Sequence, residues 1–193
     1  MGFIGKKMMS IDDLGLTQIY LSQKKIEKVL KWFKKSLEGF EPVPVHDFLG
    51  NGDLYLSDGH TRAFVAWLNG VKEIPVVYDE DEIITCEIGQ ILYKKDIGWC
   101  ERIGLHHVSS LKNRIISQSD YETFWMGRCG ALYRLEMLLL ENKVDKNLLE
   151  QEANRLEEHG YFIHGITEDL KFFCCDNNEH EVCIIENEIF KGA

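Results

Sequence analysis

The stretch that most constrains the fold of this chain is residues 54–78, LYLSDGHTRAFVAWLNGVKEIPVVY. Its first three and last six residues are runs rich in aliphatic and aromatic side chains, which favour β-strands. The middle is an amphipathic run that ends at Asn69-Gly70, a pair typical of a helix C-terminus. We therefore expect a strand at 54–56, a turn at Gly59, a helix over 60–69 and a strand over 73–78.

The segment before this stretch adds a helix and more strands. Apolar side chains recur at helical spacing from Ile26 to Phe33, and Ser22 is a suitable N-cap residue. Pro42 and Pro44 are incompatible with a helix and favour an extended chain. We therefore expect a strand over 8–14, a helix over 23–36, and a strand over 43–48 that forms a hairpin with 54–56 through a turn at 50–53.

Helical patterns dominate after residue 82. We expect helical segments within 83–99, at 109–116, from 117 to 142 and over 146–158, and then short strands over 161–190 with a turn at 176–178. This order predicts an α+β fold. We divide the fold into a first domain at 1–83, a helical extension at 84–142 and a small C-terminal helix plus β-strands at 143–193.

Composition narrows the class of protein. The formal net charge of −10 over 193 residues argues against nucleic acid as a partner, because such binding depends on neutralising phosphates. No apolar run is long enough for a signal peptide or a membrane span. The six cysteines form no CxxC pair, which argues against a zinc site. We therefore expect a cytoplasmic protein with reduced cysteines and no membrane partner.

The turn at 58–62, DGHTR, carries the chemistry. A helix that begins after Gly59 presents free backbone N–H groups, which attract anions and above all phosphate. Thr61 adds a hydroxyl, and Arg62 adds a planar guanidinium suited to phosphate or carboxylate. Asp58 could hold a metal-bound water, orient His60 or cap the helix. A purely structural interpretation is also open, in which Asp58 only caps the helix, His60 packs and Arg62 pairs with an acid.

The order of these elements resembles the ParB/sulfiredoxin-like superfamily, in which a strand, a Gly-x-x-Arg turn, a short helix and an "IPV" strand follow one another. Upstream, LTQIYLSQKKIEKVLKWF resembles the first conserved box of that superfamily and EPVPVHDF its next strand. The resemblance covers roughly residues 8–82. The segment from WCERIGLHHVSSLKNRIIS to YETFWMGRC resembles a standalone bacterial subgroup of ParB-like proteins. The resemblance implies a small mixed sheet with helices.

The residues of the turn distinguish between the branches of that superfamily. Sulfiredoxins place their reactive cysteine where this chain has His60, so their chemistry is ruled out at this site. ParB proteins, which bind CTP, carry Gly-Glu-Arg-Arg, whereas this chain has His60 and Thr61 at the two middle positions. Free serine kinases carry Asp-Gly-His-x-Arg, which is the most similar pattern to residues 58–62.

The kinase-like resemblance implies roles for individual residues. Asp58 and His60 would be catalytic, Asp58 would hold Mg²⁺, and the phosphates of ATP or ADP would lie against Gly59, His60, Thr61 and Arg62. The base of that branch is a glutamate in the first box, where this chain has Gln18. Glu41 could replace it if the fold brings Glu41 near Arg62, and His46 and Arg114 are further candidates for the site.

Three functions remain open from the sequence. The first is binding of a nucleotide or a phosphorylated small molecule at the turn, with phosphoryl transfer as its enzymatic form. The second is a non-enzymatic regulatory module associated with a nucleotide or DNA. The third is a ParB-type nuclease, which the acidic charge disfavours. The sequence leaves the acceptor substrate and the oligomeric state open.

Overall fold

A computed structural model describes residues 2–177, 181–187, 189 and 190. The chain divides into two compact units, residues 1–121 and residues 122–193. No helix within the described ranges combines the length and the apolar character needed to cross a membrane. Each unit has its own sheet, and the α+β class predicted from the sequence is confirmed.

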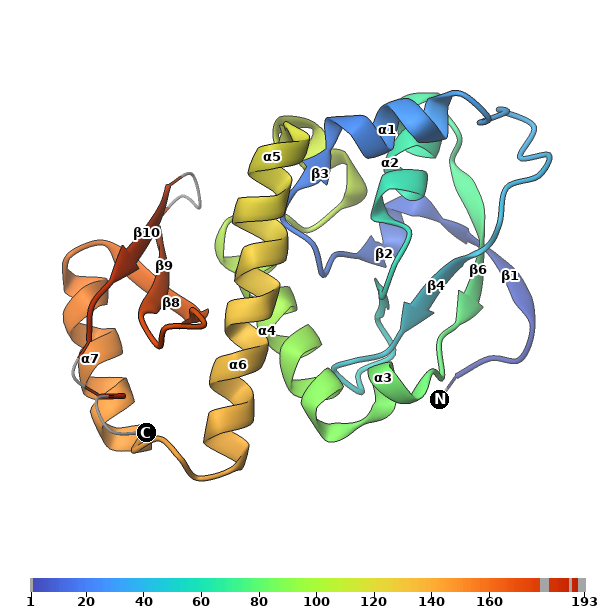
Figure 1. Cartoon of the computed structure of the whole chain (residues 1–193). Helices are drawn as coiled ribbons and strands as arrows, with labels where there is room; N and C mark the ends of the chain where they lie inside the picture. Colours follow the sequence, from blue (N-terminus) through green and yellow to red (C-terminus); the bar gives the residue numbers. More distant parts are fainter. Residues whose placement is uncertain (1, 178–180, 188, 191–193) are drawn as a thin grey trace. The chain divides into compact units, whose positions relative to one another are not determined.

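The first unit is built on a five-stranded mixed sheet with the strand order β1-β6-β4-β5-β2 (Figure 1). Antiparallel pairs join β1 to β6 and β4 to β5, whereas β4 lies parallel to β6 and β2 lies parallel to β5. The alternation of β4 and β6 places Val43, Val45, Ile74 and Val76 in the core. The strands are β1 (Lys6–Ser10), β2 (Leu14–Gly15), β4 (Val43–His46), β5 (Leu54–Leu56) and β6 (Glu73–Tyr78).

Helices complete the first unit, and α1 lies beside α2 in Figure 1. A second, two-stranded parallel pair joins β3 to β7 and so links the start of α1 to the last part of the unit. The helices are α1 (Gln23–Leu30), α2 (His60–Leu68), α3 (Glu82–Thr85), α4 (Glu87–Arg102) and α5 (Gln118–Asp120), with short 3-10 helices at Ile11–Asp13 and Val108–Asn113, and the small strands are β3 (Leu21–Ser22) and β7 (Ile115–Ile116).

The second unit has two long helices and a three-stranded antiparallel sheet of order β10-β9-β8. Helix α6 packs closely against β8. A Cβ added at Gly165 in β8 would stand 2.1 Å from the Ala131 backbone in α6. A π-helix precedes α6 at Tyr121–Gly127. The elements are α6 (Arg128–Leu140), α7 (Lys146–Glu158), β8 (Tyr161–Ile166), β9 (Phe172–Asp176) and β10 (Val182–Ile185). The turn expected at 176–178 extends beyond the described residues.

Several elements match their sequence predictions. Strand β6 and helix α7 have the expected bounds, α2 ends one residue early, and Ser22 caps α1 by accepting a hydrogen bond from the Lys25 N–H. The β4–β5 hairpin is also confirmed.

Three predictions are wrong. The helix expected over 23–36 ends at Leu30, because Trp32 and Phe33 pack against the Phe40 ring instead of continuing the helical stripe. The strand expected over 8–14 is interrupted by a 3-10 turn that the Ser10 side chain caps. The helix expected at 109–116 is a 3-10 helix followed by β7.

Candidate functional site

Gly59 forms the turn between β5 and α2. Its φ of +80° lies in the left-handed region, and it serves as the N-cap of α2 without any side-chain cap. A Cβ at this position would stand 2.7 Å from Cγ1 of Val43 and 3.0 Å from Nη2 of Arg62. Asp58 therefore does not cap the helix, and only glycine fits where the chain passes Val43.

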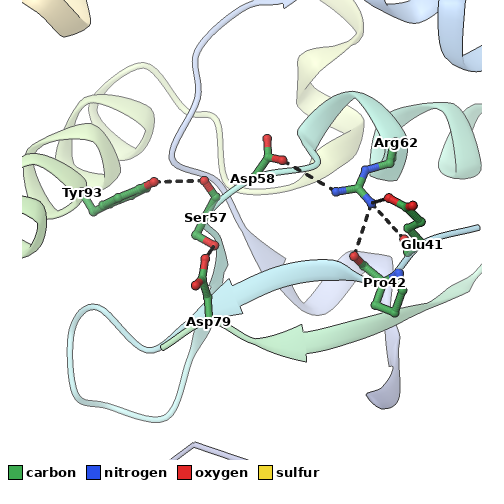
Figure 2. A network of polar contacts seen from close by, with 7 residues as sticks. All are labelled: Glu41, Pro42, Ser57, Asp58, Arg62, Asp79 and Tyr93. Atoms are coloured by element: carbon green, nitrogen blue, oxygen red, sulfur yellow. Dashed lines mark hydrogen bonds and ion pairs between the residues drawn. The ribbon is translucent and has the colours of Figure 1, made fainter. Parts of the chain in front are cut away.

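Arg62 is fixed across the turn (Figure 2). Its Nη1 donates to the carbonyl oxygens of Glu41, at 3.0 Å, and Pro42, at 3.3 Å, and its Nη2 lies 3.7 Å from the Asp58 carboxylate. The Glu41 carboxylate is 4.0 Å from Nη1. The Arg62 side chain is only 19% exposed, so the carbonyl contacts orient a cation that is largely shielded from solvent.

Ser57, the residue before the DGHTR turn, is held at three points. Its hydroxyl donates to the Asp79 carboxylate at 2.5 Å, and its N–H donates to the Pro44 carbonyl at 3.1 Å. The Tyr93 hydroxyl donates to the Ser57 carbonyl at 3.1 Å, as Figure 2 shows. Contacts from β4, from α4 and from the residue that follows β6 therefore fix the start of the turn.

His60 is the first residue of α2 and is buried. Its Nε2 accepts a hydrogen bond from the Thr17 N–H at 3.1 Å, while the Thr17 hydroxyl donates to the Leu56 carbonyl. Because Nε2 accepts, the proton of the neutral ring must be on Nδ1. Burial lowers the pKa of His60 to about 4, and the Asp58 carboxylate opposes this only in part. His60 is therefore neutral at pH 7.

The Nδ1–H of His60 is a buried donor that has no acceptor among the described residues. Most buried polar groups in native proteins have a hydrogen-bond partner, and an unmet buried donor costs about 1–3 kcal/mol. This donor therefore points to a ligand or an ordered water that supplies the missing acceptor.

His60 belongs to the lining of a pocket of about 290 Å³. Lys25, Lys28 and Arg62 give the pocket its cationic groups, and Asp58 is the only carboxylate among its described lining residues. The remaining lining residues are Gln18, Val29, Trp32, Gly59 and Thr61. A pocket with this charge pattern at a helix N-terminus suits an anion.

Two lining residues are tied to Tyr121. The Lys25 ammonium donates to the Tyr121 hydroxyl at 3.1 Å and lies 4.5 Å from the centre of its ring. The Gln18 side-chain amide donates to the Tyr20 carbonyl and lies 3.4 Å from the Tyr121 hydroxyl. These contacts hold the amine of Lys25 and the amide of Gln18 at one end of the pocket.

A larger cavity of about 430 Å³ lies elsewhere in the first unit. Its rim carries the carboxylates of Asp12, Asp13, Asp53 and Glu101, and no lysine or arginine is among the described residues that line it. Such a rim repels phosphate. Size therefore does not identify the candidate site here, and the smaller cationic pocket fits the chemistry of the turn better.

The pocket brings together most of the residues expected from the sequence: Gln18, Asp58, Gly59, His60, Thr61 and Arg62. Glu41 contacts Arg62, but its side chain is 89% exposed and is not among the described lining residues. Neither His46 nor Arg114 lines this pocket in the described part of the chain. His46 instead donates to the Asp79 carbonyl at 2.7 Å, and the Arg114 guanidinium lies over the Tyr20 ring.

Sequence reasoning missed five residues of the site. Thr17, which bonds to His60, and the lining residues Lys25, Lys28, Val29 and Trp32 were not among the candidates, and the last four were expected only as part of the helix over 23–36. The positions 25, 28, 29 and 32 are spaced as one face of a helix, and this spacing is the signal that could have grouped them. What that face meets depends on the packing of α1 beside α2, which the sequence does not show.

The site offers a metal ion one carboxylate, that of Asp58, among the described lining residues. Among the described residues, no group of three histidine, cysteine, aspartate or glutamate side chains could hold a metal. Asp58 is 81% exposed and lies 3.7 Å from Arg62. Mg²⁺ is commonly held by one or two carboxylates together with substrate phosphates. The residues present therefore fit an ion that arrives with a phosphorylated ligand rather than a metal held by the protein alone.

No protein-family model and no curated protein matches this chain. Among solved structures, the crystal structure of protein Atu1540 from Agrobacterium tumefaciens is similar to it with a TM-score of 0.35 and 16% sequence identity. That similarity covers 77% of this chain and 86% of the other chain. A TM-score of this size does not identify a shared fold. The classification of the chain as an α+β protein rests on its own sheets and helices.

Proposed function

We propose that this protein binds the phosphate of a nucleotide or of a phosphorylated small molecule in the pocket at residues 58–62. The observation that carries the proposal is the Nδ1–H of His60, a buried donor without an acceptor among the described residues. It belongs to a residue that lines a pocket with lysine and arginine side chains. A phosphate oxygen that reaches this donor would supply the acceptor that it lacks.

Further donors surround the same position. The first N–H groups of α2 have no partner within the helix, since Ala63 is the first residue whose N–H bonds back, to the Gly59 carbonyl at 2.9 Å. The Thr61 hydroxyl and the guanidinium of Arg62 line the pocket with them. Together they could share the charge of a bound phosphate.

We propose ATP or ADP, with Mg²⁺, as the ligand. Mg²⁺ would neutralise charge on the nucleotide phosphates, and Asp58 is the lining residue that can contribute a carboxylate oxygen to it. The similarity of the DGHTR turn to the free serine kinase branch of the ParB/sulfiredoxin-like superfamily supports this choice.

Phosphoryl transfer to a small molecule is a second candidate function. The observation that favours it is the carboxylate of Asp58 in the lining of the pocket. Gln18 cannot accept a proton, and the Nε2 of His60 is already occupied by the Thr17 N–H. Asp58 is then the one described lining residue whose carboxylate could take a proton from an acceptor. Without turnover, the same pocket would serve a non-enzymatic regulatory module.

The test compares the thermal unfolding of four proteins, the wild type and three variants, with inorganic phosphate, ADP and ATP, with and without Mg²⁺. A ligand at 100 times its Kd should add about 2.7 kcal/mol to the stability of the wild type. Arg62→Ala and Thr61→Val should reduce that shift. Arg155→Ala, which alters an exposed arginine paired with Glu152 in the second unit, should leave it unchanged. Absence of a shift with every phosphate compound would refute the proposal.

Two further measurements distinguish a phosphotransferase from a DNA-associated module or a nuclease. Release of ADP from ATP in the presence of candidate hydroxyl acceptors, lost in Asp58→Asn, would establish the transferase. Retention or cleavage of duplex DNA at 150 mM salt would instead favour a DNA-associated module or a nuclease. We expect neither retention nor cleavage of DNA, because the formal net charge of the protein is −10.

A further inference from the structure

The pocket has an aromatic end as well as a phosphate end. Lys25, Lys28, Val29 and Trp32 line it from α1 and the turn that follows, while residues 58–62 line it from the start of α2. Trp32 is 43% exposed. A single exposed aromatic residue is ordinary on a protein surface, but this one shares a pocket with the candidate phosphate site.

Trp32 is held in place by its own segment. Its N–H donates to the Val29 carbonyl at 3.2 Å, and its ring centre lies 6.3 Å from that of Phe40 at an interplanar angle of 54°. Phe33 packs edge-on against the same Phe40 ring. Phe40 is buried, so these contacts support the indole from the protein side while a large part of its surface stays exposed.

We propose that Trp32 stacks on the base of a nucleotide whose phosphate lies at the DGHTR turn. This inference rests on the function proposed above and adds a residue that contacts the base, so the pocket should prefer phosphate esters that carry a flat aromatic group. A sugar phosphate or a phosphorylated amino acid would satisfy the donors of the turn but would leave the indole exposed. Stacking tolerates any base, so Trp32 selects for the presence of a base rather than for its identity.

Lys28 supports this arrangement. It lies on α1, four residues before Trp32, and it also lines the pocket. No ion pair of Lys28 occurs among the described residues, whereas Lys25 is engaged with Tyr121. A flexible ammonium beside the indole can meet the negative oxygens of a nucleotide that lies across the pocket.

The experiment uses two ligands that share a phosphorylated ribose and of which only one carries a base. AMP and ribose 5-phosphate carry the same phosphorylated sugar, so the ratio of their dissociation constants measures the contribution of the base. We expect the protein to bind AMP about ten-fold more tightly, in the range of a single base–aromatic stack. Trp32→Ala should bring the two dissociation constants together, and Trp32→Phe should keep most of the difference. Trp99→Phe, outside the described lining of the pocket, is the matched control.

A fluorescence measurement adds a readout that does not depend on affinity. AMP should quench tryptophan emission in the wild type and in Trp99→Phe but not in Trp32→Phe, whereas ribose 5-phosphate should quench in none of them. Equal affinity of the wild type for the two ligands, or an AMP preference that survives Trp32→Ala, would overturn the stacking role.

Failure of this inference differs from failure of the proposed function. If ribose 5-phosphate and AMP bind equally and Arg62→Ala weakens both, the phosphate site stands and only the role of Trp32 is lost. If neither ligand binds, and inorganic phosphate does not bind either, the proposed function itself is wrong.

Discussion

The role of His60 depends on which of its nitrogens carries the proton. Since the Thr17 N–H bonds to Nε2, the ring is a neutral donor through Nδ1 and not a free base. The sequence placed His60 in the turn and assigned it a catalytic role. It could not reveal the burial that lowers its pKa or the contact with Thr17, which comes from a segment 43 residues earlier.

The lowered pKa of His60 predicts an acid-sensitive stability. The pKa is about 4 in the folded protein and 6.5 in the unfolded chain, so the unfolded state binds more protons between these values. Stability should therefore fall as the pH decreases from 6.5 towards 4, by up to about 3 kcal/mol from this group. Denaturant unfolding at pH 7.5, 6, 5 and 4 measures it.

The matched variant for this pH effect is His60→Gln. Its side-chain carbonyl can still accept from Thr17, but glutamine does not titrate, so the loss of stability on acidification should be smaller by the same amount. Parallel pH curves for the two proteins would contradict the prediction.

The same position predicts an effect on phosphate binding. His60→Gln lacks the Nδ1–H and should weaken phosphate binding. His60→Asn retains an N–H donor near that position and should bind phosphate more tightly than His60→Gln does.

At the scale of the element, the turn between β5 and α2 is held by hydrogen bonds at Ser57 and Arg62. Its existence was predictable, because a strand run, a glycine and an amphipathic run follow one another in the sequence. The closeness of Gly59 to Val43 could not be predicted, since this distance depends on the pairing of β4 with β5. The end of α1 was mispredicted for a similar reason: Phe40, ten residues beyond Leu30, supplies the packing that redirects Trp32 and Phe33.

The close approach at Gly59 predicts a severe effect of Gly59→Ala. The substitution combines backbone strain at a φ of +80° with a contact of 2.7 Å to Val43, and packing strain of this kind costs about 1–3 kcal/mol. Gly104→Ala is the control, because its φ is +75° but nothing lies within 4 Å of the added Cβ. It should show only the backbone cost of about 1–2 kcal/mol. Equal losses of unfolding free energy in the two variants would show that Val43 does not constrain the turn.

The contacts to Ser57 predict that α4 supports the turn. Tyr93→Phe removes the hydroxyl that bonds the Ser57 carbonyl and leaves the stacked contact of the ring with Phe48 in place. We expect a loss of about 1 kcal/mol in unfolding free energy, together with weaker ligand binding because the turn is less well fixed. Calorimetry and ligand titration measure the two effects. Tyr133→Phe, at an exposed tyrosine of the second unit, should change neither.

At the scale of the whole molecule, the residues of the pocket all belong to the first unit. They come from the segments 18–32 and 58–62, whereas the second unit has its own core around Leu135, Ile166 and Phe172. The sequence located the turn at 58–62, but the other wall of the pocket exists only because α1 packs beside α2. A strongly acidic chain thus gathers Lys25, Lys28 and Arg62 at one place, which the net charge conceals.

This distribution predicts where a ligand will protect the chain in hydrogen exchange. Saturating ADP should slow amide exchange in peptides that cover 17–32 and 57–65, because the donors and the Trp32 wall lie there. Peptides from α7 and β8, at 146–166, serve as the internal control and should exchange at unchanged rates. Protection centred on 97–107 would instead place the ligand in the larger acidic cavity. That outcome would contradict the phosphate site, since the carboxylates at that rim repel an anion and only a cationic ligand would be expected there.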